Sequence, residues 1–242
     1  MTHSNDRLHR FKTTRWSLVM QHDVEGVSDS RDALVDLCLR YRYPVYAYVR
    51  RCGHPPQVAH EVTHRFLQDL LGHHRQWVDR KKTGQFRTYL LECIDAFLAD
   101  DTSGAPDEPA MPELSVAAPD LELRNQNDNA QATSPEDAFQ RSFALEIFAR
   151  AFARLREEAH QTGHLSMYEA LERYLTVDPA PGEYEELAVA LRVRPLVLVV
   201  ALKRLRQRFR ELTGKELADT LESLDALEAE QQTLRAILHR HS

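Results

Sequence analysis

Two histidines one helical turn apart, with a glutamate beside the first, form a pattern that could perform hydrolysis. The run His60–His64 reads H-E-V-T-H and matches the H-E-x-x-H helix of zinc metalloproteases. In that motif both imidazoles bind zinc and the glutamate is the general base. Chance matches are easy among 12 histidines, and Leu67 and Leu70 stand where the extended motif has glycine and a third histidine. We expect no metal, cofactor or enzymatic activity, and keep a zinc hydrolase as an alternative.

A second set of residues has the spacing of a DNA-binding helix pair. The stretch Gly182–Leu212 predicts two helices joined by a tight turn. Apolar residues recur on one face of each helix: Tyr184, Leu187, Ala188 and Leu191, then Leu198, Leu202, Leu205 and Phe209. The rest of the second helix carries cations: Lys203, Arg204, Arg206, Arg208 and Arg210. A helix pair with a basic second helix is what a helix-turn-helix needs to enter a DNA groove.

The formal net charge of −6 argues against a nucleic-acid binder only until its distribution is considered. From Arg192 to Lys215 a single acid, Glu211, stands among arginines and lysines. Acidic residues gather instead between Asp101 and Pro135 and in the C-terminal tail. Segregated charges create separate surface fields, so the net value is a poor guide to the partner.

Composition predicts an all-α protein with enough apolar residues, 43%, for buried cores. Glycine is scarce, and no run alternates as a strand does. No stretch has the length of a membrane span, and the N-terminus has no apolar signal core, so we expect a cytoplasmic protein. Cys38, Cys52 and Cys93 are odd in number and without C-x-x-C pairing, which indicates reduced thiols.

Apolar periodicity divides the chain into two helical domains. In the first, residues 1–100, the expected helices are Ala33–Arg51, Gln57–Leu71 and Gln85–Ala99, with a possible kink at Pro44. Residues 101–135 are rich in Pro, Asp, Asn, Ala and Gln and predict a flexible acidic linker. The second domain, 136–214, should contain helices at 136–160 and 164–175 before the helix pair.

A final helical extension covers residues 215–242, with leucines at helical spacing between Lys215 and His239. We interpret it as a helix that packs on the second domain. A helix that dimerises or binds a partner is the alternative.

Several short motifs appear in order along nearly the whole chain outside the linker. They are F-K-T-T-R-W-S-L-V at Phe11–Val19, then Tyr43–Arg51, Gly84–Leu90, Phe97–Asp100, and Tyr184–Leu191 with Arg204–Arg206. Together with two helical domains and a C-terminal helix-turn-helix, they resemble the extracytoplasmic-function sigma factors of bacteria, and one subgroup of them in particular. The resemblance implies a dissociable subunit of core RNA polymerase that selects promoter DNA and performs no catalysis.

The resemblance also implies two DNA-binding regions. The first domain would melt the −10 element, where aromatic and basic groups hold unpaired bases. The candidates there are Trp77, Arg80, Lys81, Lys82, Phe86 and Arg87. Core packing is the alternative for Trp77 and Phe86, and a solvated loop for the two lysines.

The second domain would read the −35 element with a helix in the major groove. The candidates are Arg194, Val199, Val200, Lys203, Arg204 and Gln207. The two valines stand where the family often has polar residues, and they could touch thymine methyls or another protein surface. Arg192 replaces a usual turn glycine, which costs strain if its φ is positive. Arg194 replaces a usual capping Ser or Thr.

The polymerase-binding face departs most from the family. Its members carry an acidic run resembling E-D-A-E-D-L-T-Q-E-F, whereas Gln57–Phe66 here reads Q-V-A-H-E-V-T-H-R-F. The expected polymerase contacts are His60, Glu61, Thr63, His64 and Phe66. With most acids missing, charge complementarity to the polymerase is weak.

Thr63 suggests how the missing charge is restored. Phosphorylation adds about −1.5 to −2 charges and strong acceptor oxygens, so we hypothesise that a Ser/Thr kinase activates the protein at Thr63. An ordinary, partly buried helical threonine is the alternative. Protonated His60 and His64 would deepen the repulsion, which disfavours a pH-gated explanation. The competing class of function is a stand-alone helix-turn-helix regulator that does not bind polymerase.

Overall fold

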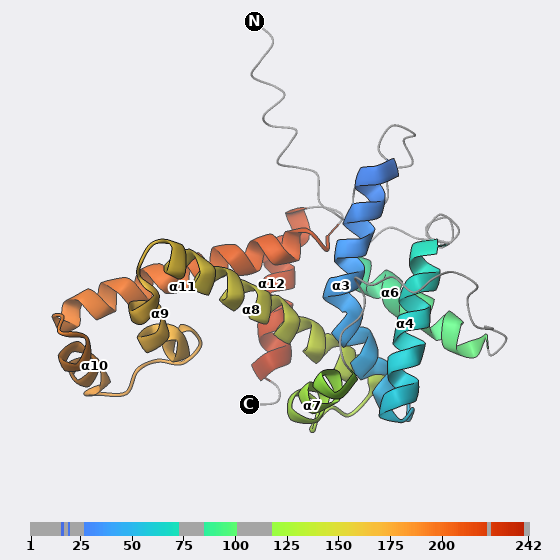
Figure 1. The fold of residues 1–242 in the computed structure, drawn as a ribbon, viewed down its shortest axis with the longest axis horizontal. Helices are drawn as coiled ribbons and strands as arrows, with labels where there is room; N and C mark the ends of the chain where they lie inside the picture. The colour runs from blue at the N-terminus through green and yellow to red at the C-terminus, as the bar shows by residue number, and fades with distance from the viewer. Residues whose placement is uncertain are drawn as a thin grey trace, which may run out of the picture. The chain divides into compact units, whose positions relative to one another are not determined.

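The structure, a computed structural model, describes Trp16, Val19 and residues 27–72, 85–100, 118–221 and 224–239. Every regular element in this part of the chain is helical, as expected (Figure 1). The α-helices are α3 (Val27–Arg51), α4 (Pro56–Gly72), α6 (Phe86–Ala99), α7 (Ala118–Asp128), α8 (Pro135–Gln161), α9 (Leu165–Leu171), α10 (Glu183–Leu191), α11 (Pro195–Ala218) and α12 (Leu227–His239). Two 3-10 helices, η3 (Glu172–Leu175) and η4 (Leu224–Ala226), complete the set. None of the described helices combines the length and apolar character of a membrane span.

The chain forms two compact units whose boundaries differ from the predicted ones. The first unit is Met1–Glu146 together with Leu217–Ser242, and the second is Ile147–Glu216. Both boundaries fall inside long helices, α8 and α11, rather than in a linker.

Stacked aromatic rings form the centre of the first unit. Trp16 and Tyr41 both contact Phe86, with ring centroids 4.8 and 4.9 Å apart, and Tyr41 stacks on Phe143 at 4.9 Å. Each ring buries a large apolar area and gains further from its preferred tilted or offset geometry. Trp16, α3, α6 and the start of α8 thus share one core.

The predicted linker is wrong over residues 118–135, because α7 packs against α3 and α4 there. The Arg50 guanidinium donates two hydrogen bonds to the Glu122 carboxylate, at 2.8 and 2.9 Å, and the Tyr46 hydroxyl donates a third at 2.6 Å. The Tyr43 hydroxyl donates to Asp128 at 2.9 Å. Two acidic residues of this segment, Glu122 and Asp128, therefore make contacts with α3. Residues 101–117 lie outside the described part.

A capped start explains why α8 begins at Pro135. The backbone N–H of Asp137 donates to the Ser134 hydroxyl at 3.1 Å, and the Asp137 carboxylate accepts from the backbone N–H of Thr133 at 3.0 Å. This reciprocal cap satisfies N–H groups that have no partner inside the helix. Proline at the first helical position is favoured because its missing N–H would be unpaired there.

The C-terminal extension belongs to the first unit, not to the second as predicted. Glu230 of α12 is 2% exposed and pairs with Arg87 of α6 at 2.8 Å. The segment before α12 contributes backbone bonds, since the N–H groups of Trp16 and Phe86 donate to the carbonyls of Asp219 and Thr220 at 3.1 and 3.2 Å. The tail completes the first core.

The second unit is a smaller helical cluster around α8, α9 and α11. Its buried residues are Ala151, Leu155, Ala159, Tyr168, Leu171, Tyr174, Leu175, Leu202, Phe209 and Leu212. Phe152 and Phe209 join α8 to α11 at a centroid distance of 4.5 Å. Tyr184 and Leu187 of α10 pack onto the same cluster, which fixes α10 beside the start of α11.

Candidate nucleic-acid interface

The turn between α10 and α11 is short and is closed by backbone hydrogen bonds. Arg192 adopts a left-handed conformation, with φ 56° and ψ 41°. Its N–H donates to the carbonyl of Val189 at 3.2 Å, and the N–H of Val193 donates to the carbonyl of Ala188 at 3.0 Å. These two bonds are the Schellman pattern that ends a helix. The strain expected from replacing glycine by arginine is therefore present, because L-residues disfavour positive φ.

The second helix, α11, starts at Pro195, directly after this turn. Leu198 and Leu202 point into the core and are buried, and Leu205 packs against it, as predicted. Proline preorganises the first turn of α11 in the absence of a capping Ser or Thr.

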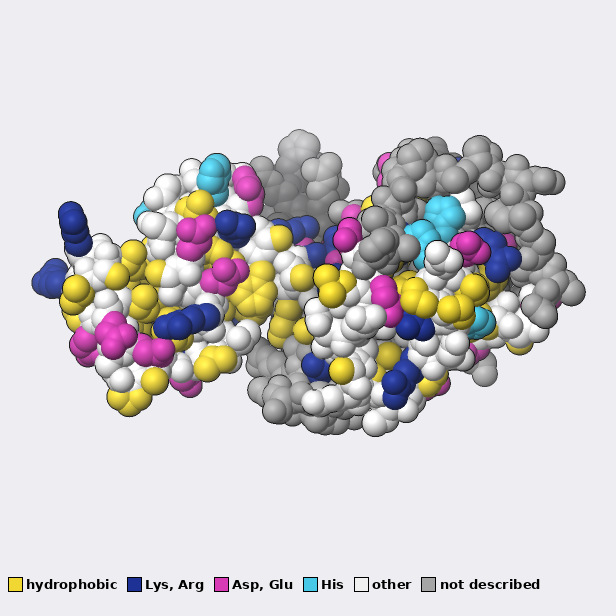
Figure 2. All heavy atoms as spheres, turned by 60° about the horizontal axis from the view of Figure 1, so that its bottom comes forward, with side chains coloured by type: hydrophobic (Ala, Val, Ile, Leu, Met, Phe, Trp, Pro, Cys, Tyr) yellow, Lys and Arg dark blue, Asp and Glu magenta, His cyan; other side chains and the backbone are white. Residues whose placement is uncertain are grey.

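The outer face of this helix pair combines exposed aliphatic and cationic side chains. Leu196 is 72% exposed, Val200 43%, and Val189 of α10 80%. Arg194 and Lys203 are also exposed, and no ion pair engages them within the described residues. Figure 2 shows hydrophobic and cationic side chains side by side at the α10–α11 end of the second unit, on the left of the view. The candidates Val199 and Arg204 lie on the same exposed surface.

Two further cations of α11, Arg206 and Arg208, make contacts inside the second unit. Arg206 donates to the carbonyl of Tyr174 at 2.9 and 2.7 Å and pairs with Asp178 at 2.8 Å. Arg208 pairs with Glu158 at 2.6 Å, and its hydrogen bonds lower the pKa of that carboxyl. The predicted contact Gln207 is exposed and donates to Glu211 at 3.1 Å. Among the described residues of this helix pair, the exposed cations without an ion pair are Arg192 and Arg194 at the turn, then Lys203, Arg204, Arg210 and Lys215 along α11.

The structure describes only two of the six residues predicted for the −10 site, Phe86 and Arg87. Trp77, Arg80, Lys81 and Lys82 lie outside the described residues. Phe86 is fully buried, so its prediction as a base-holding group is wrong and the core-packing alternative is correct.

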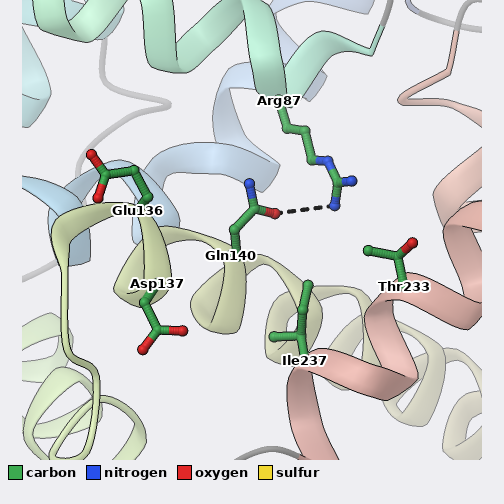
Figure 3. A pocket seen from close by; sticks show the side chains of 6 residues that line it. All are labelled: Arg87, Glu136, Asp137, Gln140, Thr233 and Ile237. Carbon is green, nitrogen blue, oxygen red and sulfur yellow. Dashed lines mark hydrogen bonds between the residues drawn. The ribbon is translucent and has the colours of Figure 1, made fainter.

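Arg87 likewise makes its contacts inside the first unit. Besides Glu230, it donates to Gln85 at 2.8 Å and to Gln140 at 3.1 Å. Figure 3 shows it above a pocket of about 400 Å³ that α6, α8 and α12 line. These contacts contradict its prediction as a DNA contact, because its hydrogen-bonding groups are used by neighbouring helices.

The α4 face also differs from expectation. The Thr63 side chain is 1% exposed, and its hydroxyl donates to the Ala59 carbonyl at 2.7 Å. Phe66 is buried and packs against Phe97 at a centroid distance of 5.5 Å. Both residues lie on the inner side of α4, so Phe66 is wrong as a polymerase contact and Thr63 is not part of an exposed charged surface.

The outer side of α4 carries Glu61 and the half-buried His60 and His64. The Arg42 guanidinium lies 3.1 Å from Nε2 of His60, within hydrogen-bonding distance. Burial, and then the charges of Arg42 and His60, lower the pKa of His64. Glu61 is the acidic residue among these three. Among the described residues, no three His, Cys, Asp or Glu side chains are grouped to hold a metal ion.

Comparisons with family models, curated proteins and solved structures find no match to this chain. The α10–α11 surface is therefore interpreted from its own geometry. Sequence reasoning missed Leu196 and Val197 as surface residues. A signal existed, because the run Leu196–Leu202 contains six aliphatic residues and one alanine, more than a single buried face of a helix can hold.

Proposed function

We propose that this protein is a sigma factor of the extracytoplasmic-function type, which directs core RNA polymerase to specific promoters. The observation that carries the proposal is the helix pair α10–α11, joined by a capped turn, with the start of α11 exposed to solvent. Leu198 and Leu202 anchor α11 from behind, while Arg194, Lys203 and Arg204 face outward. Such an arrangement suits a helix that lies in a major groove with cations on the phosphates.

The polymerase-binding part of the proposal rests on the resemblance of the first unit to these sigma factors. The hydrophobic frame of α4 is retained, with Val62, Phe66 and Leu67 buried. The outer side of α4 has little charge, so the unmodified protein should bind the basic polymerase surface weakly.

We also propose that a Ser/Thr kinase activates the protein at Thr63, and that this step requires a local opening of α4. Because the hydroxyl is buried, a kinase reaches it only when α4 opens locally. A phosphoryl group could not return to that buried position without partners for its charge. Modification would therefore rearrange the α4 surface as well as add charge to it.

The first test is transcription in vitro by core RNA polymerase with the full-length protein and a genomic DNA library. A sigma factor gives specific initiation sites that depend on the added protein. The double variant Lys203→Ala/Arg204→Ala should lose initiation at those sites by about tenfold or more, since each phosphate contact contributes to affinity.

Lys215→Ala is the matched control, an exposed lysine on α11 that lies away from the turn. Phosphorylated protein should be tested beside unmodified protein, so that weak binding by the latter is not taken as absence of function. Sequence-specific DNA binding without any stimulation of initiation in either state would favour the stand-alone regulator. Loss of initiation in Lys215→Ala as well would show that the variants act through folding.

A further inference from the structure

The solvent-facing side of α11, here called the outer stripe, changes from aliphatic to polar along the helix. Leu196, Val200, Lys203 and Gln207 are spaced by four, three and four residues, so they lie on one face of the helix. That face is opposite Leu198 and Leu202, which are buried. The first two turns of the stripe are therefore aliphatic, and only the later turns are polar. In a helix-turn-helix the first turns of the second helix make the base contacts.

Four side chains at these first turns make up what we call the aliphatic face: Leu196, Val197, Val199 and Val200. Each is at least 42% exposed. None can donate or accept a hydrogen bond, so this face cannot read the donors and acceptors of base edges. The C5-methyl group of thymine is the apolar group that natural bases present in the major groove.

Charge around the aliphatic face favours DNA over an apolar protein surface. No acidic residue occurs between Arg192 and Arg210. Arg192 and Arg194 precede the face and Lys203 and Arg204 follow it, all four exposed and without an ion pair in the part of the chain that the structure describes. Cations on both sides of an apolar strip match two phosphate backbones that flank a groove.

We propose that the aliphatic face reads thymine methyl groups, so that the DNA element bound by this protein is thymine-rich where α11 enters the groove. The inference rests on the proposed function only in taking the helix-turn-helix as a DNA reader. It does not depend on binding to the polymerase. Leu196 and Val200, on the central stripe, are the main specificity residues, and Val197 and Val199 flank them.

Deoxyuridine provides the test because it differs from thymidine by that methyl group alone. A duplex is first selected from a random library by the full-length protein, with and without core RNA polymerase. Each thymine of the selected duplex is then replaced by deoxyuridine. We expect affinity to fall by about fourfold for each contacted methyl, the equivalent of one buried methyl or methylene group.

Two variants connect the loss to the aliphatic face. Leu196→Ala and Val200→Ala should weaken binding to the thymine duplex and have a much smaller effect on the deoxyuridine duplex, because the contact is already missing there. Leu123→Ala, which truncates an exposed leucine of α7 in the first unit, is the control and should change neither affinity.

The possible outcomes separate the two proposals. Methyl-dependent binding that Leu196→Ala or Val200→Ala abolishes supports the inference. Specific binding that is insensitive to deoxyuridine overturns it and leaves the proposed function intact. Specific binding unchanged in both variants also overturns it, and would assign the aliphatic face to a protein partner. Failure to select any duplex in either condition, with phosphorylated as well as unmodified protein, overturns the proposed function itself.

Discussion

At the scale of single residues, Glu122 shows how α7 is held to α3. Hydrogen bonds from Arg50, followed by those from Tyr46 and Gln126, lower the pKa of Glu122 to about 2 against an ordinary value of 4.5. Because the folded pKa is the lower one, this carboxylate stabilises the protein fully above about pH 4.5. Its contribution is lost as the pH falls from there towards 2.

We therefore expect Glu122→Gln to lower the free energy of unfolding at pH 6 and to reduce its decrease between pH 6 and pH 3. Urea titrations followed by circular dichroism at both values would measure this. Glu92→Gln on α6 is the control, since Glu92 is exposed. An unchanged pH dependence in Glu122→Gln would contradict the role assigned to this contact.

Arg192 is a second residue whose effect can be isolated. The left-handed conformation costs arginine about 1–2 kcal/mol, of which glycine would recover part, because glycine loses more entropy on folding. Arg192→Gly should stabilise the second unit by about 0.5–1 kcal/mol, measured by urea unfolding. If Arg192 also contacts a phosphate, the same variant binds DNA more weakly despite greater stability. A destabilised variant would mean that the arginine side chain has a structural role.

At the scale of elements, α4 decides how Thr63 can act. Thr63→Val preserves the shape of the buried side chain and should change the free energy of unfolding by no more than about 1 kcal/mol. Under the kinase proposal this folded variant cannot be activated, and its promoters should stay silent in cells. Normal promoter activity would contradict the proposal and leave Thr63 as a buried helical residue. Mass spectrometry of the protein from active cells gives an independent reading.

The sequence predicts where helices form far better than it predicts which helices pack against one another. The spacing of Leu198, Leu202 and Leu205 placed the core side of α11 correctly. The polar composition around Glu122 indicated a linker, because its partners Arg50 and Tyr46 lie far earlier in the chain and local patterns do not reveal them. The role of Phe86 was equally hard to predict, since an aromatic side chain can either pack in a core or stack on an unpaired base.

At the scale of the whole molecule, the order of segments matters as much as their structure. The second unit, Ile147–Glu216, is inserted into the sequence of the first, whose final segment follows it. The predicted domain boundaries missed this because periodicity locates helices but does not show which of them share a core. Arg40, at 1% exposure, pairs with Asp36 at 2.9 Å and with Asp219 at 3.1 Å, and so joins residues from both segments of the first unit.

This order has a consequence for synthesis on the ribosome. The second unit is contiguous, so all its residues emerge before the last part of the first. The bonds that the first unit makes to Asp219, Thr220 and Glu230 can form only after these last residues have been synthesised. A nascent chain therefore contains the whole second unit, the proposed DNA-reading part, before the first unit, the proposed polymerase-binding part, is complete. Premature termination after Glu216 would yield products that contain all of the second unit and lack the final segment of the first.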